Sequence, residues 1–426
     1  MKTQIDLNGK TILVTGSPGF IGANLVLRLL DEMQSGTIVS LDNMNDYYDP
    51  ALKQYRLKMI GRKAAAKAQS GFGFGAGAGG FAGGAGANPF LQGGLGGGGG
   101  VHHEFVFGSI ADKELVDSLF EMYKFDIVVN LAAQAGVRYS IDHPDAYIES
   151  NLIGFYNILE ACRHSYDLAG ANAGSGVAAA LAAQGSMSME QARDAGGFGG
   201  KEAYQGVQHL VYASSSSVYG GNKKVPFSTD DKVDNPVSLY AATKKSNELL
   251  AHAYSKLYNI PSTGLRFFTV YGPAGRPDMF YYSATKKLSA GETIKIFNYG
   301  DMRRDFTYID DIVEGVLRVM KGAPVRETGE DGLPLPPYAV YNIGGGQPEN
   351  LLDYIATLQE ELVAAGVLPA DYDFEGHREL VGMQPGDVPV TYADAEALER
   401  DYGFTPKIGI RDGLRAFAQW YKEYYK

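Results

Sequence analysis

A glycine-rich turn near the N-terminus constrains the fold more than any other feature of this chain. Gly16, Gly19 and Gly22 follow an apolar run at 11–15 and open an amphipathic stretch near 20–33. In such a turn the first glycine permits the tight bend, the second lets a phosphate approach the backbone, and the third lets the helix pack on the strand. The sequence therefore predicts a strand, a turn and a helix whose positive N-terminus receives the diphosphate of a nucleotide.

An acidic residue indicates which dinucleotide the turn binds. Asp42 follows Gly22 by 20 residues and comes directly after the next apolar run, at 37–41. A carboxylate at this place accepts hydrogen bonds from both ribose hydroxyls and repels a 2′-phosphate. Because residues 43–45 contain no Lys or Arg, we expect the cofactor NAD rather than NADP. A glycine turn that binds another nucleotide is the alternative.

Strand-like runs alternate with helical patterns along most of the chain. This alternation predicts an α/β fold, a Rossmann-type doubly wound parallel sheet with a smaller C-terminal α/β domain for the substrate. We expect residues 1–270 and 306–344 to form the NAD-binding domain, and residues 271–305 and 345–426 to form the substrate domain. The expected strands lie at 11–15, 37–41, 105–107, 127–131, 209–213, 263–268 and 339–343.

Two low-complexity stretches interrupt this pattern. Residues 64–100 open with Ala and Lys and become glycine-rich, and residues 169–200 are rich in Ala, Gly and Ser. Neither stretch offers enough apolar surface to offset its ordering entropy, so we expect flexible loops. Each precedes a strand, which places it at the N-terminal edge of the sheet, opposite the edge where ligands bind. We expect His102 and His103, at the end of the first stretch, to lie in a loop and to hold no metal.

Charge and composition limit the partners and the compartment. The chain has 426 residues and a formal net charge of -11, which argues against a nucleic-acid partner. No apolar run is long enough to span a membrane, and the N-terminus lacks the pattern of a signal peptide. Cys162 is the single cysteine, so an intrachain disulfide is impossible. We therefore expect a cytoplasmic location.

A tyrosine and a lysine in one helical run predict acid–base chemistry. Tyr240 and Lys244 lie four residues apart within 238–258, so they share a helix face. An ammonium beside a phenol favours the phenolate, which then serves as a base near neutral pH.

The same motif recurs at Tyr282 and Lys286, so a second feature is needed to choose between the pairs. Ser215 stands at the end of the predicted strand 209–213 and precedes Tyr240 by 25 residues, whereas no comparable serine precedes Tyr282. We therefore assign the chemistry to Tyr240 and interpret the second motif as a coincidence on a helix surface.

Several long segments together resemble a known family. The chain is similar to the extended branch of the short-chain dehydrogenase/reductase superfamily, the NAD-dependent epimerases and dehydratases, and within it to the UDP-glucuronate 4-epimerases. The resemblance covers nearly everything outside the two low-complexity stretches. The matching segments are TGSPGFIG (15–22), LDNMNDYYD (41–49), NLAAQAGVRYS (130–140), ASSSSVYG (213–220), SLYAATKKSNE (238–248), LRFFTVYGPAGRPDM (265–279), RRDFTYIDDIVEG (303–315) and MQPGDVPVTYAD (383–394).

The resemblance implies a tightly held NAD that is recycled in each turnover. Tyr240 would take the proton of the sugar 4-hydroxyl while Ser215 shares that hydrogen bond, and Lys244 would bind the nicotinamide ribose. Hydride would leave C4, the 4-keto sugar would turn within the pocket, and hydride would return to its other face. The implied cofactor contacts are Gly16, Gly19, Phe20, Ile21, Gly22, Asp42, Asn43, Leu131, Ala132, Ala133, Tyr240 and Lys244.

The resemblance also implies how a UDP-sugar would bind. Thr269 and Arg276 match the residues that hold the sugar carboxylate in glucuronate epimerases, and a charge-assisted pair discriminates against neutral hexoses. Our hypothesis is that this grip keeps the 4-keto intermediate from losing CO₂. Arg304 is the candidate for the diphosphate and Asp387 for the uridine ribose. The implied substrate contacts are Arg138, Ser215, Ser216, Thr269, Arg276, Arg304 and Asp387.

Alternatives within and outside the family remain open. Residues 213–220 lack the acids of the related dehydratases and UDP-glucuronate decarboxylases, and Thr269 stands where UDP-glucose/galactose 4-epimerases have Asn. Decarboxylation and neutral-hexose epimerisation are the nearest alternatives. A non-catalytic NAD-binding protein would lose the Tyr/Lys pair, which this chain keeps. The family pairs through two long helices, here expected near 146–165 and 238–258, so we expect a homodimer.

Overall fold

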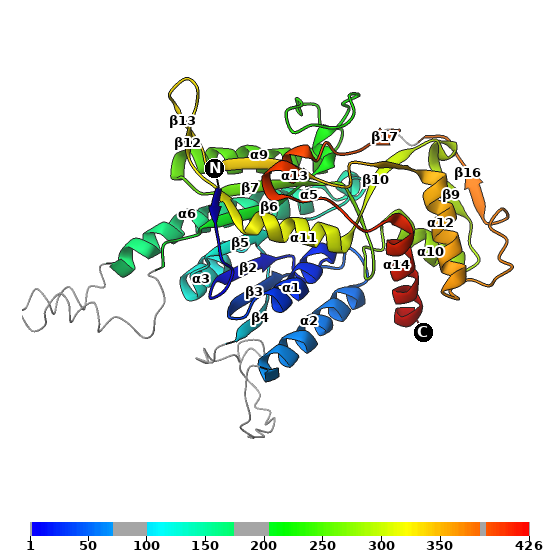
Figure 1. Ribbon diagram of the computed structural model, residues 1–426, viewed down its shortest axis with the longest axis horizontal. Helices are drawn as coiled ribbons and strands as arrows, with labels where there is room; N and C mark the ends of the chain where they lie inside the picture. Colours follow the sequence, from blue (N-terminus) through cyan, green and yellow to red (C-terminus); the bar gives the residue numbers. More distant parts are fainter. Residues whose placement is uncertain (1, 71–99, 174–203, 384–388, 426) are drawn as a thin grey trace, which may run out of the picture.

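A seven-stranded parallel sheet forms the centre of the computed structural model, which describes residues 2–70, 100–173, 204–383 and 389–425 (Figure 1). Its strand order is β14-β7-β6-β5-β2-β3-β4, so the chain winds outward in both directions from β2. This order is that of a doubly wound sheet, and the predicted fold class is confirmed. The strands are β2 (Thr11–Thr15), β3 (Gly36–Asp42), β4 (Val101–Phe107), β5 (Ile127–Asn130), β6 (His209–Ser215), β7 (Ser262–Phe267) and β14 (Tyr338–Ile343).

Helices cover both faces of this sheet because its strands are apolar on both sides. In β2, Ile12 and Val14 belong to one hydrophobic cluster, whereas Leu13 between them belongs to another. The first cluster includes α1, α2 and α11, and the second includes α3, α6 and α9. These helices are α1 (Phe20–Glu32), α2 (Pro50–Ser70), α11 (Ile309–Met320), α3 (Lys113–Tyr123), α6 (Gly154–Ala173) and α9 (Leu239–Tyr258).

The low-complexity stretches differ in part from the prediction. Residues 64–70 continue α2 and residues 169–173 continue α6, so the expected loops are wrong there. Ala and Lys are good helix formers and prolong a helix already begun. The remaining parts, 71–99 and 174–200, lie outside the described residues. As predicted, the flanks of the first stretch meet the N-terminal edge of the sheet, where Gly36 N donates to Gly100 O.

The two histidines lie in a strand and not in a loop. His102 and His103 belong to β4, where they pair with Thr37 and Ile38 of β3. The His103 ring nitrogen Nε2 lies 2.9 Å from Ser40 Oγ. Burial, with a smaller contribution from His102, lowers the pKa of His103 to about 4. The expected loop is therefore wrong, because strand pairing overrides the glycine-rich sequence just before it.

A smaller sheet stands beside the large one at the right of Figure 1. Its strand order is β15-β10-β17, and β8 pairs with the other end of β10. The chain enters it directly after β7, leaves it through α11, and returns to it after β14 with β15 and β17. The predicted domain boundaries at 270, 305 and 344 stay a prediction. The strands and adjacent helices are β8 (Thr269–Tyr271), β10 (Arg303–Tyr308), β15 (Pro348–Asn350), β17 (Val390–Thr391), α10 (Phe280–Ser289), α12 (Leu351–Ala364) and α14 (Ile410–Tyr425).

The remaining elements are short. A π-helical segment precedes α6, so the helix expected near 146–165 is built from three consecutive pieces. Within the described ranges, no helix combines the length and the apolar character that crossing a bilayer requires. The short elements are β1 (Lys2–Gln4), α4 (Tyr139–Asp142), α5 (Pro144–Tyr147), the π-helix Ile148–Ile153, the 3-10 helices Ser216–Tyr219 and Phe297–Gly300, β9 (Ile294–Ile296), β11 (Gly322–Pro324), β12 (Glu327–Thr328), β13 (Pro334–Leu335), β16 (Arg378–Leu380) and α13 (Glu396–Tyr402).

Candidate active site

A cavity of about 1080 Å³ opens at the carboxyl ends of the large sheet's strands, between that sheet and the smaller one. Ligands of doubly wound proteins bind at this edge. Every predicted site residue that the structure describes lines the cavity. From the cofactor set these are Gly16, Gly19, Phe20, Ile21, Gly22, Asp42, Asn43, Leu131, Ala132, Ala133, Tyr240 and Lys244. From the substrate set they are Arg138, Ser215, Ser216, Thr269, Arg276 and Arg304. Asp387 lies outside the described residues.

The glycine turn has the shape of an anion cradle. Gly16 has a φ of +68°, and a Cβ on it would lie 2.8 Å from Ala132 N. A Cβ on Gly19 would lie 2.8 Å from Gly16 O. No side chain caps the N-terminus of α1, and Ser17 Oγ is buried without a partner among the described atoms. Free N–H groups at a helix N-terminus, with no side chain in the way, fit the diphosphate of a dinucleotide.

The acidic residue at the end of β3 has a cationic neighbour that sequence reasoning missed. Asp42 Oδ1 accepts from Met44 N at 2.6 Å, and Lys53 Nζ lies 3.3 Å from the same oxygen. Lys53 also donates to Asn45 Oδ1 at 2.9 Å. It comes from the first turn of α2, beyond the three positions that the sequence argument considered. Only the fold brings this lysine to the carboxylate.

The structure brings Ser215 and Tyr240 together. Ser215 ends β6, and Tyr240 lies in the first turn of α9, which Ser238 caps by accepting from Ala241 N at 3.1 Å. Burial raises the pKa of the Tyr240 phenol, while a hydrogen bond with Ser215 and the charge of Arg276 lower it. The hydroxyl and the phenol therefore face one position in the cavity.

Lys244 contacts the backbone of β6. Its Nζ donates to Ala213 O at 2.9 Å, and burial lowers its pKa to about 8. The cation that lowers the pKa of the Tyr240 phenol is Arg276 rather than Lys244, because the lysine ammonium is directed at a backbone carbonyl. Direct stabilisation of the phenolate by Lys244 stays a prediction.

The tyrosine of the competing motif is in the core and not on a helix surface, whereas Lys286 is exposed. Tyr282 is 1% exposed, packs on α14, and places its hydroxyl 2.9 Å from that of Tyr425. Burial raises its pKa above the ordinary range. It does not line the cavity, whereas Tyr240 does. Assigning the chemistry to Tyr240 stays a prediction, and the expected surface position of Tyr282 is wrong.

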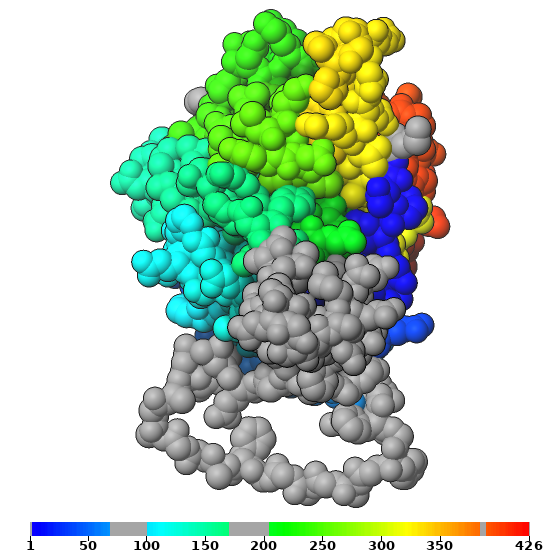
Figure 2. Space-filling model, turned by 90° about the vertical axis from the view of Figure 1, so that its left-hand side faces the viewer, coloured from blue at the N-terminus to red at the C-terminus, as the bar shows by residue number. Residues whose placement is uncertain are grey.

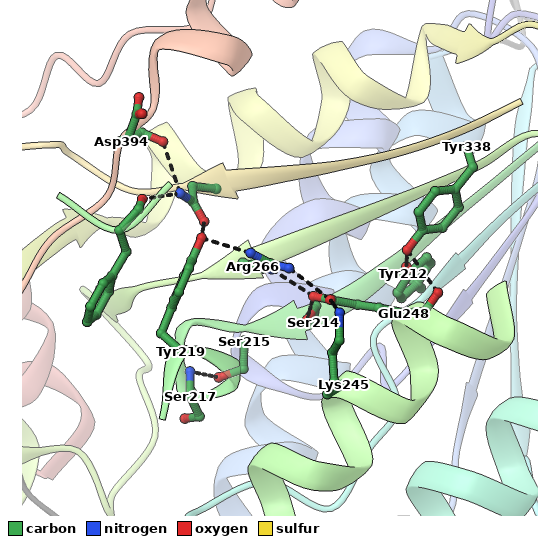
Figure 3. A network of polar contacts seen from close by, with 12 residues as sticks. Tyr212, Ser214, Ser215, Ser217, Tyr219, Lys245, Glu248, Arg266, Tyr338 and Asp394 are labelled. Atoms are coloured by element: carbon green, nitrogen blue, oxygen red, sulfur yellow. Dashed lines mark hydrogen bonds and ion pairs between the residues drawn. The ribbon is translucent and has the colours of Figure 1, made fainter. Parts of the chain in front are cut away.

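A buried polar network holds the serine strand against the tyrosine helix (Figure 3). Ser214 Oγ on β6 donates to Glu248 Oε1 on α9 at 2.7 Å. Arg266 on β7 makes two hydrogen bonds to the same carboxylate, at 2.8 and 2.9 Å, and both side chains are 3% exposed. Arg266 Nη1 also donates to Tyr219 OH at 2.9 Å. Paired charges with this geometry are strong and direction-specific. The network thus ties α9 to β6 and β7 directly behind the cavity.

A second carboxylate accompanies the arginine predicted to hold the substrate. Arg276 donates two hydrogen bonds to the Asp278 carboxylate, one from Nη2 at 2.6 Å and one from Nε at 3.1 Å. Tyr47 OH donates to Asp278 Oδ2 at 3.0 Å. Burial opposes ionisation of Asp278, but Arg276 more than offsets it and lowers the pKa of that carboxyl. Tyr47 and Asp278 lie in two of the family-like segments, 41–49 and 265–279. Nothing in the sequence indicates that these two side chains are in contact.

The other predicted substrate residues lie along the same wall. The Arg138 guanidinium carbon is 5.7 Å from the centre of the Phe297 ring. Arg304 Nη1 donates to the carbonyl oxygens of Arg303 and Pro389, each at 3.0 Å. Arg304 comes from β10 of the smaller sheet, whereas Arg138 comes from the segment between β5 of the large sheet and α4.

A family model agrees with this arrangement. The model of the NAD dependent epimerase/dehydratase family matches residues 12–344, which is most of the chain. The chain belongs to this family. Protein CapI of Staphylococcus aureus is 40% identical over 97% of this chain and 99% of its own length. UDP-glucuronate 4-epimerase 4 of Arabidopsis thaliana is 37% identical over 98% of this chain and 76% of its own length.

A solved structure is similar over the same span. The UDP-glucuronic acid 4-epimerase of Bacillus cereus, in complex with UDP-glucuronic acid and NAD, is 26% identical with a TM-score of 0.67. The match covers 97% of this chain and 100% of that one. As a member of the epimerase/dehydratase family, this chain thus has its serine, tyrosine and glycine turn on the family's fold. The described residues contain no group of three or more His, Cys, Asp or Glu side chains suited to a metal ion.

Proposed function

We propose that this protein interconverts UDP-glucuronate and UDP-galacturonate by inverting C4, with NAD recycled in each turnover. The observation that carries the proposal is the meeting of Ser215, Tyr240 and Arg276 at one cavity that the glycine turn also lines. The relatives named UDP-glucuronate 4-epimerase support the substrate, and the Bacillus cereus complex supports both substrate and cofactor.

Tyr240 is the general base and acid of this proposal. Its phenolate, hydrogen-bonded to Ser215, takes the proton of the sugar 4-hydroxyl and becomes the phenol as C4 becomes a ketone. The phenol returns that proton after the sugar has turned. Ser215 holds the 4-oxygen in both orientations. A bound NAD would supply the hydride acceptor and donor for C4. Lys244 keeps the β6 end and α9 in place through the carbonyl of Ala213 and presents its ammonium beside the cofactor.

Arg276 and Thr269 give the proposal its substrate class. A guanidinium binds a carboxylate through two parallel hydrogen bonds, and a neutral hexose cannot replace that contact. Arg276 already makes such a pair with Asp278, so its side chain is oriented before a ligand arrives. Held at C6, the carboxylate of the 4-keto intermediate keeps its bond to C5 out of line with the carbonyl π system, and CO₂ is retained.

The test is product analysis without added cofactor. The purified protein is incubated with UDP-glucuronate, and the products are followed by NMR. We expect UDP-galacturonate, and we expect Tyr240→Phe to slow its formation by about 10²–10⁴-fold. UDP-xylose as the product would instead indicate a decarboxylase. Turnover of UDP-glucose alone would indicate a neutral-hexose epimerase, and either result contradicts the proposal.

We also propose that two copies pair through α6 and α9. These helices contact each other on one face of the sheet, and Figure 2 shows the green segment of α6 beside the lighter green of α9. The outward side chains of these two helices, and of the π-helix that leads into α6, include apolar groups that are 44–70% exposed. A four-helix arrangement of two copies would cover these groups, which water otherwise contacts. They are Ile153, Tyr156, Leu249 and Leu257.

We propose the cytoplasm as the compartment and small molecules, rather than nucleic acid, as the partners. Cys162 is buried, and burial raises the pKa of its thiol, so the one cysteine is unreactive. The net charge of -11 disfavours binding to phosphate backbones. The two-domain division belongs to the same proposal, with the nucleotide sugar held between the two sheets.

A further inference from the structure

A fully buried arginine lies between the cofactor turn and the substrate arginine. Arg56 on α2 is 1% exposed, and the five donor hydrogens of its guanidinium all have acceptors. Nε and Nη2 donate to Ala274 O at 2.9 and 2.7 Å, and Nη2 also donates to Gly275 O at 2.8 Å. Nη1 donates to Pro18 O at 3.0 Å and to Tyr48 OH at 2.7 Å.

The acceptors of this cation are all neutral. Three are backbone carbonyls and one is a hydroxyl, and within the described ranges no ion pair joins Arg56 to an Asp or Glu. A buried charge without a counter-charge is costly, and a neutral side chain of similar volume would pack here at lower cost. The charge therefore needs a reason beyond packing.

One group of these carbonyls belongs to the turn that leads to Arg276. Gly272 has a φ of +145° and Ala274 a φ of +50°, a left-handed conformation that a residue with a Cβ rarely adopts. Arg56 places two donors on the carbonyl of Ala274 and one on that of Gly275. Because Arg276 follows this turn directly, the turn sets where its guanidinium enters the cavity.

The remaining carbonyl belongs to the cofactor side. Pro18 lies between Gly16 and Gly19, inside the turn that receives the diphosphate. The guanidinium of Arg56 thus lies directly behind that turn, and an anion bound in front of it supplies the compensating charge. A single side chain fixes the backbone of both turns.

We propose that Arg56 is a positioning residue that couples the retention of NAD to the recognition of the uronate carboxylate. It holds the glycine turn and the 272–276 turn in one fixed relation, and the diphosphate of NAD balances its charge. Binding at one turn therefore strengthens binding at the other, and linkage makes the effect reciprocal. The inference rests on the proposed function, since it needs a carboxylate at Arg276.

The test uses three variants of the full chain. Arg56→Met removes the charge and all donors while keeping most of the volume, Arg56→Lys keeps the charge with fewer donors, and Arg62→Met is the control at an exposed position of the same helix. Calorimetry measures the NAD affinity of protein stripped of cofactor. It also measures the affinities for UDP-glucuronate, UDP-glucose and UDP, with and without NAD.

We expect Arg56→Met to weaken NAD binding about tenfold and to reduce the preference for UDP-glucuronate over UDP-glucose by a similar factor. Binding of UDP should change by less than about twofold, because the uridine side is held by other residues, and Arg62→Met should behave as wild type. General loosening of the fold would instead weaken the binding of UDP-glucuronate, UDP-glucose and UDP together.

Two results overturn the inference. One is a folded Arg56→Met protein that keeps both its NAD affinity and its uronate preference. If that variant does not fold, Arg56→Lys decides, because a lysine cannot reach both turns with the same geometry, and an unchanged uronate preference in it refutes the coupling. A wild-type protein without preference for UDP-glucuronate would contradict the proposed function itself, which separates the two failures.

Discussion

The ionisation of one phenol governs the proposed chemistry at the scale of single residues. Burial and the charge of Asp278 raise the pKa of Tyr240, and Ser215 and Arg276 lower it. Since the base form is the phenolate, turnover rises with pH through this pKa. Asp278→Asn removes a negative charge and should move the acidic limb of the kcat profile to lower pH by about one unit.

Arg276→Met removes the opposing charge and should move the same limb to higher pH. Measuring kcat against pH at saturating substrate for both variants tests these two opposite shifts. Asp278 and Arg276 variants that shift the limb in the same direction would show that Tyr240 is not the titrating group. The opposite signs matter, because general damage to the site would not produce them.

Replacing Gly22 and Gly61 with Ala should change the stability of the fold in opposite directions. A Cβ at Gly22 would collide with the carbonyl oxygen of Gly16, whereas a Cβ at Gly61, in α2, meets no atom within 4 Å. Overpacking costs about 1–3 kcal/mol, so Gly22→Ala should lower the melting temperature, and we expect NAD affinity to fall about tenfold. Gly61→Ala should stabilise the fold by about 0.5–1 kcal/mol with NAD affinity unchanged. Melting curves and NAD titrations of both variants decide.

Residues that stand at a strand end or helix start could be predicted from the sequence. Gly16, Ser215 and Tyr240 each follow or open an element that the hydrophobic pattern itself predicts, so their meeting at one edge followed from topology. Arg56 and Asp278 could not be found in this way. The role of Arg56 arises from its contact with Ala274, and that of Asp278 from its contact with Tyr47. Each contact joins residues more than two hundred positions apart in sequence.

At the scale of elements, the ion pair between α9 and β7 carries a stability prediction. Glu248→Gln leaves Arg266 buried without its counter-charge, which should cost about 3–5 kcal/mol. Burial raises the pKa of Glu248, but Arg266 more than offsets this and the net shift is downward. A carboxyl with a lowered pKa stabilises the fold above its unfolded pKa, and that stability is lost as the pH falls through the folded value.

The difference in the free energy of unfolding between wild type and Glu248→Gln should therefore become smaller as the solution is acidified. Urea unfolding at several pH values measures it, and the double variant Glu248→Gln with Arg266→Met should recover part of the loss. A gap of the same size at acidic and neutral pH would mean that the pair contributes nothing through ionisation.

The elements themselves were predicted as far as their apolar periodicity allowed. All seven strands of the large sheet were expected, since each contains an apolar run, although β4 is mostly half-buried and only its end, 105–107, was predicted. The end of α2 was placed too early, because the sequence becomes low in complexity at residue 64 while the helix continues to residue 70. The π-helical segment Ile148–Ile153 depends on tertiary packing and has no sequence signal. Strands β15 and β17, of three and two residues, are too short to show a period.

At the scale of the whole molecule, exposed apolar side chains predict the assembly. Leu249 and Leu257 on α9 are 60% and 70% exposed and lie two turns apart, on the helix that also carries Tyr240. Replacing both with Glu would bury charges in the proposed interface between two copies, which costs several kcal/mol, so we expect a monomer.

The control is Leu380→Glu, an exposed leucine of β16 beside the smaller sheet, which should leave the mass unchanged. Light scattering after size-exclusion chromatography gives the mass of each variant. Pairing would pack α9 against a helix of the partner copy and hold its first turn, where Tyr240 faces Ser215. We therefore expect a monomeric variant to have a lower turnover as well. A wild-type protein that is already monomeric at micromolar concentration would refute the pairing and leave the Ser215–Tyr240 chemistry intact.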